Sequence, residues 1–405
     1  MMCSPEVAGT LYGELTSYAS RRSIAPMRVK LLTQASAKSH RPERLFSRDS
    51  CPIIGAGRLG EIFVKASAAG LEKLAYEIEH NTSSLVVKEL STIEIIEPVT
   101  DVFRRHGQEP LEILRRCPRG KKGFVTRVRL FDLGGDEDQR EATDDFFATC
   151  EARHLEVNQA GYNPRSYIYA VECEAVDDIE ALSRTIGVRS ISQMPVIRSL
   201  KPKMFNLQPL PATLPRADDV EGDFPVVVVV DSGVSNQDPA LESWVAGRES
   251  YVSPPYRNTD QGTFVAGLVC WGSQLNPQLV HVSALPCGVY DLQVIPNLDP
   301  SRGDTDELTE SEFLQTLETA LKQHANRFKV WNISLGTDEV CSLDEFSPLV
   351  EQLDNLQEKY QVSFVISAGN YDSPPLLDYP RTKSQLEAGR ITLNSGFSAL
   401  LISES

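Results

Sequence analysis

The stretch PVVVVVDSGV, residues 225–234, decides the fold, because an uninterrupted run of five valines leads directly into Asp231. A strand that is apolar at every position is typical of a parallel sheet with both faces covered. The acidic residue then stands at the carboxyl end of the strand, which is where ligands bind in open α/β sheets. The stretch therefore predicts a buried parallel strand with a functional end.

Downstream of this stretch, helical and strand patterns alternate. Two amphipathic segments, 310–328 and 348–360, have apolar residues at helical spacing. Each is followed by an apolar run, VWNISLG (330–336) and VSFVISAGN (362–370). Alternating strands and helices indicate parallel βαβ units, so we expect a doubly wound α/β domain over residues 225–405.

Four segments precede this domain. Residues 122–198 show the order strand, helix, strand, strand, helix, strand, which predicts an α+β ferredoxin-like domain. Five prolines in residues 201–225 are typical of a linker. The expected segments are a polar N-terminal arm (1–50), a small α/β segment with a basic loop (51–121), the ferredoxin-like domain (122–200) and a Pro-rich linker (201–224).

Composition excludes several classes of protein. The 405 residues carry a net charge of −16, which argues against binding nucleic acid. The eight cysteines are scattered without metal-ligand spacing, so we expect reduced thiols, no metal site and a cytoplasmic location. We find no apolar run long enough to span a membrane and no signal-peptide pattern.

Four short motifs occur at the predicted strand ends and helix start. They are D-S-G at 231–233, Q-G-T-F-V-A-G at 261–267, S-L-G at 334–336 and S-A-G-N at 367–370. In this order they resemble the subtilisin-like serine peptidases (subtilases, peptidase family S8), whose pattern is D-[ST]-G, H-G-T-H-V-A-G, S-L-G, S-A-G-N and G-T-S-M-A-x-P. The resemblance covers about residues 225–370. Residues 122–198 are also similar to the propeptide of that family.

The resemblance implies a role for individual residues. Asp231 matches the aspartate of the catalytic triad, which orients a histidine. Asn370 matches the side-chain donor of the oxyanion hole. Ser334, Leu335 and Gly336 match the edge that receives a polypeptide substrate as an added strand. No cofactor is implied.

Two departures from the family pattern change the expected activity. Gln261 occupies the position of the catalytic histidine, and an amide cannot accept the proton of a serine nucleophile. Phe264 replaces the second histidine of that block, which is not the catalytic one. No G-T-S-x-A-x-P block follows Asn370, so no nucleophilic serine is assigned and the sheet is expected to be incomplete. We therefore expect an inactive chain, in which Gln261→His alone would not restore activity.

Three hypotheses for function remain open. The first is a serine endopeptidase lineage whose sequence was lost by truncation or a broken reading frame, as the abrupt end ITLNSGFSALLISES suggests. The second is a non-catalytic pseudo-protease that binds a peptide or acts as a scaffold, with a partner protein or self-association through the incomplete sheet. The third is nucleotide binding by Gly55, Gly57 and Gly60, for which a glycine-rich turn is the better interpretation because a β-like segment follows.

Overall fold

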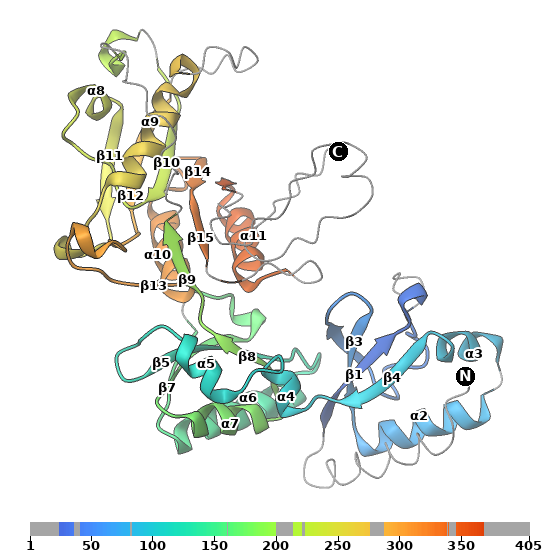
Figure 1. The fold of residues 1–405 in the computed structure, drawn as a ribbon. Helices are drawn as coiled ribbons and strands as arrows, with labels where there is room; N and C mark the ends of the chain where they lie inside the picture. Colours follow the sequence, from blue (N-terminus) through green and yellow to red (C-terminus); the bar gives the residue numbers. More distant parts are fainter. Residues whose placement is uncertain are drawn as a thin grey trace, which may run out of the picture. The chain divides into compact units, whose positions relative to one another are not determined.

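The computed structural model describes residues 24–35, 41–81, 83–159, 161–199, 214–220, 223–275, 287–337, 339 and 346–367. The chain divides into two compact units (Figure 1). Unit 1 consists of Met1–Gln159 and Asn163–Met194, and unit 2 consists of Ala160–Tyr162 and Pro195–Ser405. Each unit has its own hydrophobic core.

The first sheet of unit 1 has four antiparallel strands in the order β2-β3-β1-β4. Their bounds are β1 Ala25–Leu31, β2 Ile53–Ala56, β3 Glu61–Ala66 and β4 Ile93–Pro98. Strand β1 contradicts the irregular arm expected for residues 1–50, since it lies between β3 and β4. Its buried Met27, Val29 and Leu31 alternate with more exposed Arg28 and Lys30, a pattern too short to stand out in a polar sequence.

Two helices connect β3 to β4, so the predicted order of strand, helix and strand is present. Helix α2 spans Ala68–His80, and helix α3 spans Ser84–Leu90. Each begins after a serine whose side chain accepts a backbone N–H of the first turn, Ser67 for α2 and Ser83 for α3. The helices contribute Leu71, Leu74 and Val86 to the core of this sheet.

The glycines at 55, 57 and 60 belong to a β-hairpin. Strands β2 and β3 pair antiparallel across the turn, and Gly60 has a positive φ of 84°. A dinucleotide site needs a helix directly after such glycines, with its N-terminus facing the phosphates. Since β3 follows instead, the predicted glycine-rich turn is confirmed.

The second sheet of unit 1 has the antiparallel order β6-β7-β5-β8. Its elements follow the predicted sequence of strand, helix, strand, strand, helix, strand. They are β5 Phe124–Leu130, α6 Asp136–Ala152, β6 Glu156–Asn158, β7 Ile168–Cys173, α7 Val176–Arg184 and β8 Val188–Gln193. The core between sheet and helices contains Phe146, Val171, Ile179 and Leu182.

A buried arginine in the segment that connects the two sheets of unit 1 hydrogen-bonds to the second sheet and its helix. Arg104 lies at the end of the short helix α4 (Asp101–Arg104) and is 1% exposed. Its guanidinium donates to the carbonyls of Ser183 (3.0 Å), Ile186 (3.4 Å) and Val188 (2.7 Å). Ser183 lies in the last turn of α7, whose carbonyls have no partner within the helix, whereas Ile186 and Val188 lie beyond it.

Unit 2 contains a five-stranded parallel sheet in the order β11-β12-β10-β14-β16. The strands are β10 Val226–Asp231, β11 Val245–Ser250, β12 Gly288–Gln293, β14 Val330–Ile333 and β16 Ser363–Ile366. The valine run forms β10 at the centre, where Val228, Val229 and Val230 are buried. The predicted parallel α/β domain is therefore present.

Helices cover both faces of this sheet (Figure 1). Helix α9 (Asp260–Leu275) packs Val265 and Ala266 against Val229 and Val289 of the sheet. Helices α10 (Glu310–His324) and α11 (Pro348–Tyr360) pack against each other. The ring of Tyr290 from β12 lies against His324 at the end of α10. Because side chains alternate along a strand, Tyr290 and Val289 point to opposite faces.

The expected linker is partly folded. Residues 214–220 include the 3₁₀ turn Ala217–Asp219, and they pack Ala217 against the core around Trp244. The indole N–H groups of Trp244 and Trp271 both donate to the carbonyl of Pro215, at 3.0 and 3.1 Å. The prediction of a linker was wrong for residues 214–220. These residues are anchored by the backbone carbonyl of Pro215, and a contact made by the backbone leaves no pattern in the sequence.

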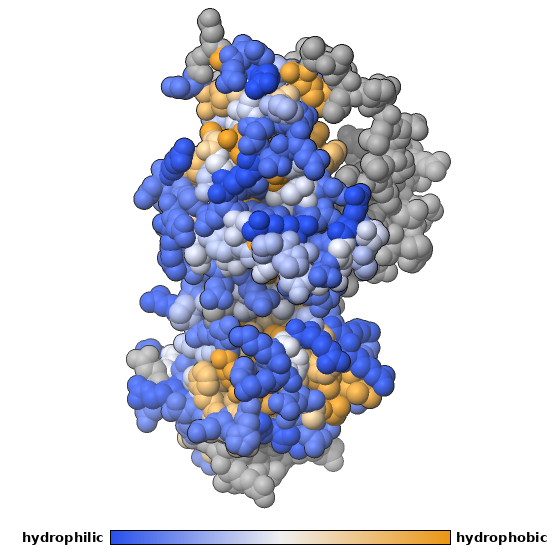
Figure 2. All heavy atoms as spheres, turned by 90° about the vertical axis from the view of Figure 1, so that its left-hand side faces the viewer, coloured by the Kyte–Doolittle hydropathy of each residue, from blue (hydrophilic) through white to orange (hydrophobic). Residues whose placement is uncertain are grey.

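Hydrophilic residues cover most of the face seen in Figure 2, and the hydrophobic residues on it form separate small patches. In the described part of the chain, no helix has the length and apolar character needed to cross a membrane.

Candidate functional site

Asp231 lies at the carboxyl end of β10, as the valine run predicts. Its side chain has no exposed surface, and one carboxylate oxygen, Oδ1, accepts the backbone N–H of Ser232 at 2.6 Å. Burial raises the pKa of Asp231 to about 7, and the nearby carboxylate of Asp291 acts in the same direction. Hydrogen bonds from Ser232 act in the opposite direction but do not cancel the effect of burial.

The Asp231 turn and the start of helix α9 are in direct contact. The hydroxyl of Ser232 accepts the N–H of Gly262 at 3.1 Å. Gly233 has φ of +104°, and a Cβ on Gly262 would lie 2.3 Å from the Gly233 carbonyl oxygen. Only glycine at position 262 allows this approach, which places Gln261 in the first turn of α9 beside the Asp231 turn.

The described part of unit 2 places no histidine on the sheet face of Asp231. His324 is the one described histidine in that unit, and it lies with Tyr290 on the sheet face opposite to Val229. Asp231 is two residues beyond Val229 and therefore shares the α9 face. His324 instead pairs with Glu249, at 2.6 Å between Nε2 and Oε2. His281 lies outside the described residues.

The S-L-G segment forms a strand edge that is already occupied. Strand β15 (Leu335–Thr337) pairs antiparallel with β9 (Val196–Ser199), and β9 also pairs antiparallel with β13 (Leu308–Thr309). Arg198 is opposite Gly336, and Ile197 lies between Leu308 and Thr337. A segment of the chain itself therefore lies as an added strand on the edge that the sequence assigns to substrate (Figure 1).

The S-L-G residues contribute to this edge through their backbone. Leu335 is buried, and Gly336 is within the β15–β9 ladder. The hydroxyl of Ser334 donates to the side-chain carbonyl of Asn332 at 2.8 Å, which is a structural interaction. Asn370, the residue matched to the oxyanion hole, lies outside the described residues. The described neighbour Ser367 donates its backbone N–H to the Ile333 carbonyl at the end of β14.

Two features of this region were missed from the sequence. Asp291, 5% exposed, is paired in register with Val229 and accepts the N–H of Val234 at 3.0 Å. An acidic residue in the middle of the apolar segment GVYDLQV was the available signal. Strand β9 was missed because the sequence predicts a single strand at the end of residues 122–198. The structure divides this stretch into β8 and the separate strand β9, whose sequence is VIRS.

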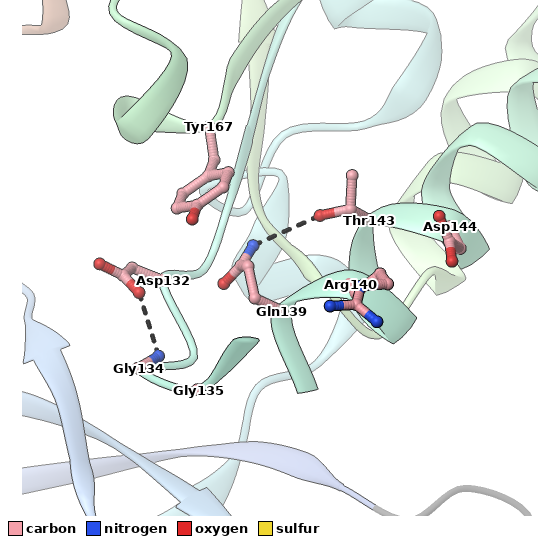
Figure 3. A pocket seen from close by; sticks show the side chains of 8 residues that line it. All are labelled: Asp132, Gly134, Gly135, Gln139, Arg140, Thr143, Asp144 and Tyr167. Carbon is pink, nitrogen blue, oxygen red and sulfur yellow. Dashed lines mark hydrogen bonds between the residues drawn. The ribbon is translucent and has the colours of Figure 1, made fainter. Parts of the chain in front are cut away.

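A hollow lies in unit 1, beside the start of helix α6. It has a volume of about 390 Å³ and is lined by Asp132, Gly134, Gly135, Gln139, Arg140, Thr143, Asp144 and Tyr167 (Figure 3). The Asp132 carboxylate accepts the N–H of Gly134, and Gln139 bonds both the Leu133 N–H and Thr143. Because these polar groups hydrogen-bond to one another, we interpret the hollow as part of a surface loop and not as a ligand site.

Metal ligation finds no support in the described residues, among which no group of three or more His, Cys, Asp or Glu side chains could hold a metal ion. Residues 222–392 match the model of the Subtilase family, peptidase S8. No curated protein matches the chain.

Proposed function

Residues 222–392 match the subtilase family, and from this premise we propose that the protein binds extended peptide strands without hydrolysing them. It is a subtilisin-like serine peptidase homologue in which strand recognition persists and acyl transfer does not. The observation that carries this proposal is β9, which lies hydrogen-bonded between β13 and β15.

The loss of hydrolysis follows from Gln261. Nucleophilic attack by a serine requires a base that removes the hydroxyl proton, and histidine serves in the family pattern. A glutamine side chain is neutral and cannot accept that proton at neutral pH. The described histidine of unit 2, His324, lies on the other face of the sheet, so it does not compensate.

Strand recognition is supported by the way β9 is held. Val196 and Ile197 are 3% and 1% exposed, whereas Arg198 is exposed and lies 3.8 Å from Glu307. Backbone pairing provides affinity for any extended segment, and buried side-chain positions provide selectivity. The preferred ligand is therefore an extended segment with two consecutive aliphatic residues followed by a basic one.

The bound strand is fastened at its beginning by helix α10. The N–H of Glu310 donates to the Pro195 carbonyl at 2.8 Å, and the Glu310 carboxylate accepts the hydroxyl of Tyr162 at 2.7 Å. Gly161 approaches the same helix so closely that a Cβ would lie 2.4 Å from the Ser311 carbonyl oxygen. We infer that this intramolecular strand competes with external peptides, so the chain is self-inhibited.

A peptide-binding experiment tests the proposal. A labelled peptide of sequence MPVIRSL (residues 194–200) is titrated into the parent chain and into Ile197→Asp, which weakens the resident strand. Because the apparent dissociation constant is inversely proportional to the fraction of chains with an open edge, we expect Ile197→Asp to bind at least about tenfold more tightly. A peptide with the same Ile→Asp change is the matched control. Absence of saturable binding by a folded Ile197→Asp chain would contradict the proposal.

If the chain were an active peptidase, it would cleave an unfolded protein substrate. We expect no cleavage of an unfolded protein substrate by the parent chain. Cleavage that disappears in Asp231→Ala would show that an active peptidase centre exists, and it would overturn the assignment as a binding module.

A further inference from the structure

Three buried oxygens near the end of β10 have no hydrogen-bond partner among the described residues. They are Asp231 Oδ2, Asp291 Oδ1 and Gln261 Oε1. The second oxygen of each carboxyl group is satisfied, Asp231 Oδ1 by the Ser232 N–H and Asp291 Oδ2 by the Val234 N–H. All three remaining atoms are acceptors unless a carboxyl group is protonated, so what they lack is a donor.

Leaving buried acceptors without a donor costs free energy. A water, a metal ion or a proton could supply the interaction. A water needs two to four polar partners and space of its own, and a hard cation such as Ca²⁺ needs about six to eight oxygen ligands. A proton needs no additional space and only one acceptor, and it also removes the charge of a fully buried carboxylate.

We propose that Asp231 is a neutral carboxylic acid in the folded protein and donates its proton to Gln261 Oε1. In the serine peptidase triad, an ionised aspartate accepts a hydrogen bond from an imidazole N–H. The unpartnered atom of Gln261 is Oε1, an acceptor, so a hydrogen bond between this atom and Asp231 requires the proton to be on Asp231. The contact between the Asp231 turn and the first turn of α9, through Ser232 and Gly262, brings the two side chains into one region.

The charged groups around Asp231 support this assignment. Asp291 on β12 faces it from the same side of the sheet, and burial raises the pKa of Asp291 to about 6. Arg248 on β11 is 3.4 Å from the Asp291 carboxylate and forms a bidentate pair with Glu242 of helix α8 (Pro239–Glu242). Arg248 is therefore engaged by two other acids.

Helix α9 contributes one further charged group at its start. Asp260 is exposed and paired with Arg302 at 3.3 Å, so this acid is balanced by a cation of its own. Burial raises the pKa of Asp231 to about 7, which is well above the ordinary value. The folded state therefore holds the proton more tightly than the unfolded state. The resulting stabilisation is complete below the ordinary carboxyl pKa and is lost as the pH rises through the folded value.

The test uses the full chain and follows unfolding by tryptophan fluorescence. All three tryptophans, Trp244, Trp271 and Trp331, lie in unit 2, so the signal reports that unit alone. Between about pH 5 and pH 8, the denaturant midpoint of the parent should fall as the pH rises. Asp231→Asn should remove the part of this fall above about pH 6, because an asparagine amide donates to Gln261 at every pH, and should leave the part at lower pH to which Asp291 contributes. A parent midpoint that is constant or rises over this range overturns the proposal.

Two further variants locate the proton. Asp291→Asn is the matched control and should keep the fall in midpoint; if it abolishes the fall while Asp231→Asn keeps it, the proposal is wrong. Infrared difference spectra at about pH 5, recorded in the Asp291→Asn background so that the second buried carboxyl is absent, should show the carbonyl band of a protonated carboxyl that an added Asp231→Asn change removes. Gln261→His gives an answer even if Asp231→Asn does not fold, because an imidazole donor should ionise Asp231 and eliminate the band. A band that persists in Gln261→His contradicts the assignment.

Discussion

Gly262 shows at the scale of one residue how closely two parts of the candidate site approach. The position follows Gln261 in the first turn of α9, and its missing side chain faces the Gly233 carbonyl. The sequence motif Q-G-T contained this residue, but only the structure shows which atom makes the glycine necessary. Gly267, one and a half turns later, has no such neighbour: a Cβ there would lie 3.8 Å from the Trp271 ring.

The two glycines therefore predict opposite effects of the same substitution. Gly262→Ala forces an atom to within 2.3 Å of a backbone oxygen and should destabilise unit 2 by about 1–3 kcal/mol, the usual cost of overpacking. Gly267→Ala should stabilise it by about 0.5–1 kcal/mol, because alanine favours the helix. Denaturant unfolding followed by tryptophan fluorescence measures both. Equal effects at the two positions would show that the contact with Gly233 is not important.

At the scale of elements, helix α10 begins with a capping box that also borders the occupied edge. The Thr309 hydroxyl accepts the N–H of Glu312, and the Glu312 carboxylate accepts the N–H of Thr309 at 3.0 Å. Thr309 pairs with Val196 through its backbone as part of β13. The cap of the helix and the edge of the three-stranded sheet therefore meet at one residue.

Thr309→Ala should cost about 1 kcal/mol of the stability of unit 2, since the helix loses a side-chain cap. Thr309→Ser keeps the hydroxyl and should lose only a fraction of this amount. The backbone of β13 is unchanged in both variants, so affinity for the MPVIRSL peptide should be similar in the Ile197→Asp background. A large loss of affinity in Thr309→Ala but not in Thr309→Ser would indicate that the cap also positions the edge.

The elements also show what a single sequence can reveal. The valine run, the amphipathic segments at 310–328 and 348–360 and the order of elements in 122–198 were predicted, because each has a clear periodicity. Strand β1 was missed because its alternation covers only seven residues, 25–31. The candidate site could be predicted only in part from the sequence. Asp231 and Gln261 stand in recognisable motifs, whereas Asp291 is brought beside them by its register with Val229.

At the scale of the whole molecule, the two units should differ in their response to pH. An aspartate with a pKa shifted from about 4 to about 7 contributes up to about 4 kcal/mol between the two extremes of pH. Circular dichroism reports the helices of both units, whereas the tryptophans report unit 2. We expect two unfolding transitions by circular dichroism, of which only the one shared with fluorescence moves to lower denaturant as the pH rises. A common shift of both transitions would contradict a local origin at Asp231.

The Pro215 carbonyl, which accepts the indole N–H groups of Trp244 and Trp271, has a consequence for the evolution of this chain. An anchor made by the main chain is present whatever side chain the residue carries. Residue 215 can therefore change while this anchor persists, and an alanine substitution there would underestimate the attachment, whereas Leu214, Ala217 and Val220 of the same segment also pack through their side chains. The family match begins only at residue 222, so the structured domain extends further toward the N-terminus than its inherited sequence signature.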